Sequence, residues 1–244
     1  MFPTFSPCGD SAILVTFGST IDLATNRRAH TLARLLQARP TGPAKNSETD
    51  FAKSSGIREA VAGYTTLLVH YDPLVLDYAQ ALEWVQERAE EARQAGVAED
   101  PAALGGNDIL PAPRRVEVPV IYGGEGGPDL EFVARHNGLT PEEVVRRHSA
   151  RDYPVYLIGF TPGFPYLAGL DERIAAPRLS SPRQVAPAGS VGIAGQQTGI
   201  YPVDSPGGWR LIGWTPLKLF DPQRQPASLL APGDVVRFVK KGTG

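Results

Sequence analysis

The sequence predicts a small α+β domain followed by a mainly-β domain with the pattern of a barrel or sandwich. Three observations support this fold class. The first part of the chain interleaves β-rich runs with two amphipathic helix patterns. The second part holds many short β-capable runs separated by turns. Glycine and proline together number 16 in residues 1–114 but 33 in residues 115–244. We therefore place an α+β domain at 1–95, a linker at 96–114 and a β-rich domain at 115–244.

In the first domain, two apolar runs have the composition of strands. Asp22 can cap a helix whose apolar positions include Leu32 and Leu36, and Pro73 precedes a second helical pattern. Between them lies a polar, aperiodic segment that is typical of a loop. The expected elements are strands at 11–17 and 65–71, helices at 22–39 and 73–94, and a loop at 40–56.

In the second domain, the clearest local signal is Thr140-Pro141-Glu142-Glu143, with Thr140 as N-cap, proline at the first helical position and Glu143 at the third. Gly138 can terminate the helix before it. Short β-capable runs surround these helices. The expected elements are helices at 129–137 and 140–148, and strands at 116–121, 153–158, 190–194, 209–213, 217–220 and 234–239.

The composition excludes several classes of protein. Hydrophobic residues make up 42% of the 244 residues, so the 26 glycines and 23 prolines indicate turns rather than disorder. The net charge of −2 argues against a nucleic-acid or anionic-membrane partner, since either needs clustered Lys and Arg. No apolar run approaches the ~20 residues that span a bilayer, and the first residues lack the pattern of a signal peptide. We expect a cytoplasmic protein.

Candidate catalytic groups are few. His148 is the best acid–base candidate, because the ordinary pKa of histidine lies near neutrality. Its place at the end of a helix is an open alternative, since a histidine there can serve the helix dipole alone. No two histidines have ligand spacing, so no metal site is predicted. Cys8 is the one cysteine and is expected to be a buried structural thiol.

Residues 156–216 have the pattern of loops around a rigid binding site, with 10 glycines and 8 prolines among apolar side chains. The cations in this stretch are all arginines, whose planar fork pairs with a carboxylate or phosphate. Neutral hydrogen-bonding side chains there could read an amide or lactam, or could satisfy the backbone in turns. The substrate-binding candidates are Phe160, Pro162, Gly163, Phe164, Tyr166, Arg178, Arg183, Pro187, Gly189, Ser190, Gly192, Gln197, Thr198 and Tyr201.

At these residues the sequence resembles a known family. The motifs Gly159-Phe-Thr-Pro-Gly-Phe-Pro-Tyr166, Pro187-Ala-Gly-Ser-Val-Gly-Ile-Ala-Gly195, Ser205-Pro-Gly-Gly-Trp209 and Thr215-Pro-Leu-Lys-Leu-Phe-Asp-Pro222 are similar to those of the 5-oxoprolinase B subunit (PxpB) family. That family is also described as allophanate hydrolase subunit 1, and it includes the sporulation kinase inhibitor KipI. The resemblance spans essentially the whole chain and implies that the second domain is a cyclophilin-like β-barrel.

The resemblance also implies a function. In that family the B subunit works with a homologous C subunit and with an A subunit, and together they open the lactam 5-oxoproline to L-glutamate with ATP as the driving force. Whether this chain itself binds ATP stays open. Two departures from the family are an insertion at 40–56 and Trp214, which stands where the family usually has arginine.

Three alternatives remain from the sequence. One is a regulatory protein that, like KipI, binds and inhibits a histidine kinase. Another is a carboxyltransferase-type subunit of an enzyme that metabolises allophanate or urea. A third, peptidyl-prolyl isomerisation, rests on fold analogy alone, and the arginine–phenylalanine–glutamine set of true cyclophilins is not recognisable in the sequence.

Overall fold

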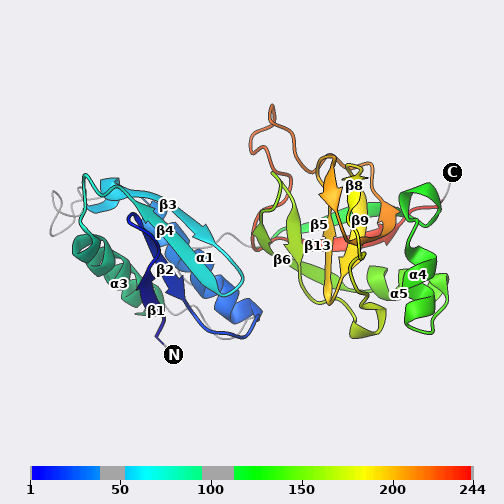
Figure 1. Ribbon diagram of the computed structural model, residues 1–244, viewed down its shortest axis with the longest axis horizontal. Helices are drawn as coiled ribbons and strands as arrows, with labels where there is room; N and C mark the ends of the chain where they lie inside the picture. Colours follow the sequence, from blue (N-terminus) through cyan, green and yellow to red (C-terminus); the bar gives the residue numbers. More distant parts are fainter. Residues whose placement is uncertain (1, 39–52, 95–112, 243–244) are drawn as a thin grey trace. The chain divides into compact units, whose positions relative to one another are not determined.

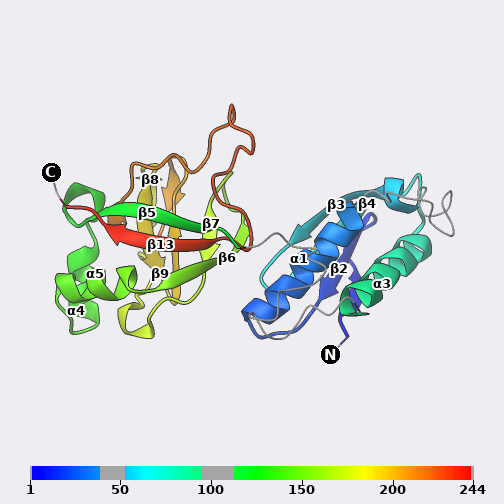
Figure 2. The same cartoon turned by 180° about the vertical axis from the view of Figure 1, so that it is seen from behind.

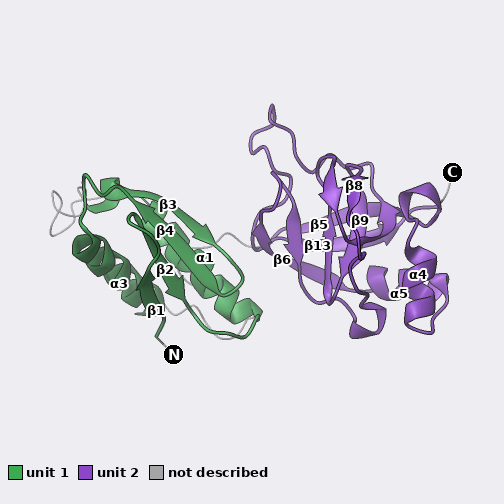
Figure 3. Ribbon diagram, viewed as in Figure 1, with its two compact units in different colours: residues 1–112 green, residues 113–244 purple. Residues whose placement is uncertain are grey.

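A computed structural model describes residues 2–38, 53–94 and 113–242 of the chain (Figure 1). The chain divides into two compact units, residues 1–112 and 113–244 (Figure 3). Most of the linker predicted at 96–114, and most of the loop predicted at 40–56, lie outside the described residues. Each unit is described by itself.

Unit 1 is a four-stranded antiparallel sheet in the order β1-β2-β4-β3, with two helices on one face (Figure 2). Residues on alternate positions of β4, such as Leu67 and Val69, are fully buried in the core that the sheet shares with the helices. The sequence predicts β2, β4 and both helices, but misses the two edge strands. The elements are β1 (Thr4–Pro7), β2 (Ala12–Thr16), α1 (Leu23–Gln37), β3 (Ile57–Ala62), β4 (Thr66–Tyr71) and α3 (Tyr78–Gln94).

The start of α1 confirms the predicted cap. The Asp22 carboxylate accepts a hydrogen bond from the backbone N–H of Thr25 at 2.7 Å, which satisfies one of the free donors at the helix N-terminus. This bond helps to lower the pKa of Asp22 below its usual value. Leu32 and Leu36 lie on the buried face of the helix, as the apolar spacing predicts.

Unit 2 contains a closed barrel of seven strands in the order β10-β7-β6-β13-β5-β12-β9, closed by the pairing of β10 with β9. The barrel that the sequence predicts is confirmed, while the cyclophilin-like name stays a prediction. A separate two-stranded sheet pairs β8 (Arg183–Ala186) with β11 (Ser205–Gly207). The barrel strands are β5 (Arg115–Tyr122), β6 (Asp152–Ile158), β7 (Pro165–Leu167), β9 (Ser190–Ala194), β10 (Gln197–Ile200), β12 (Arg210–Trp214) and β13 (Val235–Lys240).

Two helices pack on the barrel: α4 (Leu130–His136) against β12 and α5 (Pro141–Ser149) against β13. The Thr140 hydroxyl accepts from the backbone N–H of Glu143, as the sequence predicts. Apolar side chains of both helices join the barrel core, which is built largely from β-branched residues of the strands. Two single 3₁₀ turns, η1 (Gly124–Gly126) and η2 (Glu172–Ile174), complete the unit.

Two expectations are wrong. Residues 217–220 form no strand, and Phe220 makes an isolated bridge to Ser228. The physical reason is Arg224, whose guanidinium donates to the carbonyls of Lys218 and Leu219, so these groups have a partner without a strand ladder. Cys8 is exposed rather than buried. It lies in the turn between β1 and β2, next to Gly9, whose φ of +68° marks the chain reversal.

Within the described residues, no helix combines the length and apolar character that crossing a membrane requires. In the same ranges, no three His, Cys, Asp or Glu side chains are grouped as a metal ion would need.

Candidate functional site

Unit 2 brings a loop segment with a free arginine against the link between β11 and β12. The backbone N–H of Leu179 donates to the carbonyl of Gly208 at 2.7 Å, and Arg210 Nε donates to the carbonyl of Pro177 at 3.2 Å. These bonds fix the backbone on either side of Arg178. The Arg178 side chain is exposed, and the described residues give it no ion pair or hydrogen bond. Its five donors are therefore available to a ligand.

Behind this segment lies a cluster of aromatic rings centred on Phe164. The rings of Tyr166, Tyr201 and Trp209 have their centroids 5.0 to 5.4 Å from that of Phe164, each in a tilted or edge-on arrangement. Such pairs add roughly 0.5–1.5 kcal/mol each beyond the burial of their area. The cluster makes a rigid apolar wall, of which Tyr166 is partly exposed.

Two glycines make room for these rings. A Cβ at Gly199 would lie 3.0 Å from Phe164 and 3.1 Å from Trp209, and a Cβ at Gly207 would lie 2.3 Å from the Tyr201 hydroxyl. The hydroxyl therefore sits against the backbone of Gly207. Burial raises the pKa of Tyr201, against the smaller opposing effects of the Trp209 backbone N–H and of the Arg178 and Arg183 charges. The phenol stays neutral.

Asp129 is the counter-charge of the site and was not singled out by sequence reasoning, which used it only as the start of a helix. Its carboxylate accepts from Arg183 at 2.7 Å and from the backbone N–H of Leu211 at 2.7 Å, with Arg210 at 3.7 Å. Arg210 also lies over the ring of Phe132, 3.5 Å from its centroid. One carboxylate thus faces two guanidinium groups, and Arg178 adds a third positive charge nearby. The excess positive charge suits an anionic ligand.

The Arg183 side chain has its bonding partners within the protein. Besides Asp129, it donates to the carbonyl of Trp209 at 3.2 Å, and its side chain is about one quarter exposed. Of the two predicted carboxylate-binding arginines, the structure therefore leaves Arg178 free and gives Arg183 an internal partner. Sequence reasoning could not separate them, because a lone arginine in a loop has the same appearance in both cases.

His148 lies in the barrel core with no exposed surface. The Thr198 hydroxyl donates its one proton to the carbonyl of Gly192 at 3.0 Å, so it must accept from His148 Nε2, 2.9 Å away. Nδ1 is then free to accept from the Tyr122 hydroxyl at 2.8 Å. Burial lowers the pKa of His148 to about 3, which keeps the ring neutral. This enclosed geometry is that of a core histidine, and the proton-transfer role stays a prediction without geometric support.

The other predicted site residues fall into three groups. Tyr166 and Tyr201 belong to the Phe164 cluster, and Gly192 contacts the Trp209 side chain of that cluster. Thr198 points to His148, and Gln197 lies beside it on β10. The remaining residues lie in two turns, Phe160, Pro162 and Gly163 between β6 and β7 and Pro187 and Gly189 before β9, with Ser190 as the first residue of β9.

Trp214 takes part in the second of these turns. Its indole Nε1 donates to the carbonyl of Ala188 at 2.8 Å. A Cβ at Gly189 would lie 2.7 Å from that nitrogen, and a Cβ at Gly126 would lie 2.7 Å from the Trp214 Cβ. Trp214 therefore packs against two turns, one at Gly126 and one at Gly189. The described geometry gives it a structural part where the family usually has arginine.

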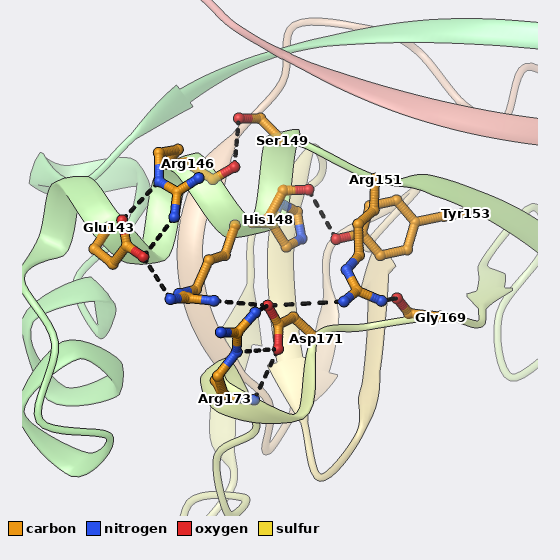
Figure 4. A network of polar contacts seen from close by, with 10 residues as sticks. Glu143, Arg146, His148, Ser149, Arg151, Tyr153, Gly169, Asp171 and Arg173 are labelled. Atoms are coloured by element: carbon orange, nitrogen blue, oxygen red, sulfur yellow. Dashed lines mark hydrogen bonds and ion pairs between the residues drawn. The ribbon is translucent and has the colours of Figure 1, made fainter.

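A second arginine cluster lies at the end of α5, and each of its arginines has a carboxylate partner (Figure 4). The Asp171 carboxylate accepts from Arg147 and Arg173 at 3.0 Å each, and Arg151 lies at 3.8 Å. Arg147 is shared with Glu143 at 2.6 Å. Hydrogen bonds from Arg173 hold the pKa of Asp171 well below its usual value, and the arginines beside Glu143 lower its pKa to about 2. Both carboxylates therefore stay charged at neutral pH and keep their bonds to the arginines.

Comparison with known proteins places the chain in a family. A family model described as "Carboxyltransferase domain, subdomain C and D" matches residues 3–230. The 5-oxoprolinase B subunit of Bacillus subtilis is 45% identical over 238 residues, 95% of this chain and 90% of that protein. The protein of the same name from Escherichia coli O157:H7 is 41% identical over 239 residues, 97% of this chain and 95% of that one.

Among solved structures, a chain named TTHA0988 is 37% identical with a TM-score of 0.73, and the match covers 96% of this chain. This chain spans 40% of the length of TTHA0988. The fold, the family model and the full-length relatives agree. The chain belongs to the carboxyltransferase subdomain C and D family and, within it, to the group of 5-oxoprolinase B subunits.

Proposed function

We propose that this chain is the B subunit of an ATP-dependent 5-oxoprolinase, which opens the lactam 5-oxoproline to L-glutamate together with its A and C subunits. The observation that carries the proposal is Arg178, an arginine without an internal partner among the described residues, fixed beside an aromatic wall. It occurs in a chain whose full-length relatives are named as the B subunit of 5-oxoprolinase.

The chemistry of the substrate fits this site. 5-Oxoproline carries one carboxylate and one ring amide. A guanidinium fork such as that of Arg178 pairs with a carboxylate through two parallel hydrogen bonds. The partly exposed ring of Tyr166 offers an apolar surface to the flat lactam ring. The excess positive charge around Asp129 favours an anionic ligand over a neutral one.

The reaction needs more than binding. Water must add to the lactam carbonyl carbon and the carbon–nitrogen bond must break, and ATP supplies the driving force for this in the proposed complex. The titratable groups that the described residues bring to this site are arginines, a bonded aspartate and the phenols of Tyr166 and Tyr201. We therefore assign substrate binding to this chain and leave the phosphate chemistry to the complex, which acts in the cytoplasm where ATP is available.

The test is reconstitution. This chain is co-expressed with the A and C subunits from the same genome, and glutamate release is measured with and without ATP. The proposal expects ATP-dependent release that disappears when this chain is omitted and returns when it is added back. Release that continues unchanged without the chain overturns the proposal.

A carboxyltransferase-type subunit is the second candidate, and the name of the matched family model favours it. In that case the reconstituted protein would act on urea or allophanate rather than 5-oxoproline, and the same assay with those substrates separates the two. Binding of a histidine kinase stays a prediction from the sequence.

A further inference from the structure

The turn between β6 and β7 holds Phe160 in a conformation that a large side chain rarely adopts. Phe160 has a φ of +64° and is the one residue other than glycine with a positive φ in the described chain. The N–H of Thr161 donates to the carbonyl of Gly159 at 2.8 Å, which closes a three-residue γ-turn around Phe160. A γ-turn with positive φ is the rare, strained form, and for a bulky residue the strain is real.

The strain does not serve burial. The Phe160 side chain is 63% exposed, although an apolar ring gains by leaving water. A single exposed apolar residue needs no explanation by itself. Here the chain accepts both an unfavourable backbone conformation and an exposed ring at a position where glycine would avoid both costs. Strained residues that persist in this way cluster at sites of function.

The ring is also firmly supported. Phe164 packs edge-on against Phe160 with centroids 5.6 Å apart, and Phe164 is itself the centre of the buried aromatic cluster. The turn is closed by two more backbone bonds, from Gly159 N–H to Phe164 O at 3.0 Å and from Phe164 N–H to Thr161 O at 3.0 Å. A rigid aromatic side chain presented to solvent has the properties of an interface anchor, because little entropy is lost when it binds.

We propose that Phe160 is an anchor that inserts into an apolar pocket on a companion subunit of the same complex. This rests on the proposed function, and it gives Phe160 a role in assembly rather than in substrate binding. Two findings favour a protein occupant. The relatives are named as one subunit of an enzyme, and this chain matches 40% of the longer TTHA0988 chain, which carries additional protein on the same polypeptide.

The experiment measures binding of this chain to the purified A and C subunits by calorimetry or interferometry. Phe160→Ala removes the ring, and Phe160→Gly removes the ring together with the strain. We expect both variants to bind at least tenfold more weakly than the wild type. We also expect Phe160→Gly to keep or raise the midpoint of thermal unfolding, which separates lost binding from lost folding.

Val239→Ala is the matched control, since Val239 is an exposed apolar residue of the same unit, 40% exposed and outside the candidate site. It should bind as the wild type does. If the wild-type complex forms and the Phe160 variants bind equally well, the inference is overturned while the proposed function stands. The inference is also overturned if they assemble normally but raise KM for 5-oxoproline, because Phe160 then contacts substrate. If the wild type binds neither of the two subunits, the proposed function fails, and the inference fails with it.

Discussion

Unit 2 has two clusters of arginines, one around Asp171 and one around Asp129, and they differ in whether every arginine has a partner. Around Asp171, three arginines meet a carboxylate, and Glu143 supplies a second (Figure 4). Around Asp129, two arginines share a single carboxylate, and Arg178 stands beside them without a partner in the described residues. The difference lies in the supply of acceptors rather than in the number of arginines. Each arginine of the Asp171 cluster has a carboxylate within 4 Å and helps to hold the fold, while Arg178 has none among the described residues and is open to an anion.

The largest expected effect is the pH dependence of the free energy of unfolding. His148 and the neighbouring Asp171 should contribute to it in different pH ranges. The pKa of His148 is about 3 in the folded chain and about 6.5 when unfolded. Between these values the unfolded chain binds a proton that the folded chain does not, so the free energy of unfolding should fall as the pH drops from 6.5 to 3. At about 1.4 kcal/mol per pKa unit, the full loss is roughly 5 kcal/mol.

Denaturant unfolding at a series of pH values checks this. The carboxyl of Asp171, with its pKa held below the usual value of 3.8, loses its contribution to stability only as the pH falls through about that value, so it adds little to the slope between pH 6.5 and 4. A His148→Gln variant removes the titrating ring and should flatten the slope between pH 6.5 and 4, although it starts from a lower stability. An unchanged slope in this variant contradicts the assignment.

The next effect is the loss of stability when either Asp129 or Asp171 is neutralised. Asp129→Asn leaves Arg183 and Arg210 without a counter-charge, and we expect a loss of roughly 2–3 kcal/mol in the free energy of unfolding, since partial exposure screens the arginines. Asp171→Asn should cost less, about 1–2 kcal/mol, because Arg147 keeps Glu143 as a partner. Chemical denaturation of both variants ranks them, and a larger loss of stability in Asp171→Asn contradicts the expected order.

A smaller effect tests the spare arginine. Arg178→Ala should raise KM for 5-oxoproline in the reconstituted complex by tenfold or more, equivalent to at least ~1.4 kcal/mol of binding. The unfolding midpoint should not move, because the described residues give the side chain no bond to lose. Arg178→Lys keeps the charge but not the fork, and should recover part of the affinity. A normal KM in the alanine variant removes Arg178 from the site.

The smallest effect is expected at Arg173. Its side chain is 65% exposed although bonded to Asp171, and exposed ion pairs contribute roughly 0–1 kcal/mol. Arg173→Ala should therefore leave KM unchanged and lower the free energy of unfolding by no more than that. It is the matched control for Arg178→Ala, and a raised KM here would place ligand at the wrong cluster.

The sequence predicts most where local rules decide. The caps at Asp22 and Thr140 mark their helices correctly, since capping depends on neighbouring residues alone. It fails where residues outside the segment decide. The run at 217–220 has the composition of a strand, but the nearby Arg224 takes two of its carbonyls. The short strands β7, β8, β10 and β11 depend on pairing across intervening segments, β7 with β10 and β8 with β11.

The same limit applies to the candidate site. Arg178, Arg183 and the aromatic residues could be named from their loop, because arginine, glycine and ring side chains in that pattern indicate a binding surface. The sequence could not show which arginine stays free, since Asp129 lies 54 residues from Arg183 and has the local appearance of a helix start. Burial of His148 depends likewise on the packing of α5 against β13.

The place of β13 in the barrel has a consequence for how the protein is made. This strand lies between β5 and β6, parallel to the first and antiparallel to the second. During translation, β5 and β6 leave the ribosome more than 70 residues before Val235, and until then each has an unpaired edge on that side. Ring closure is therefore a late event in synthesis, and the nascent unit has open strand edges of the kind that chaperones protect.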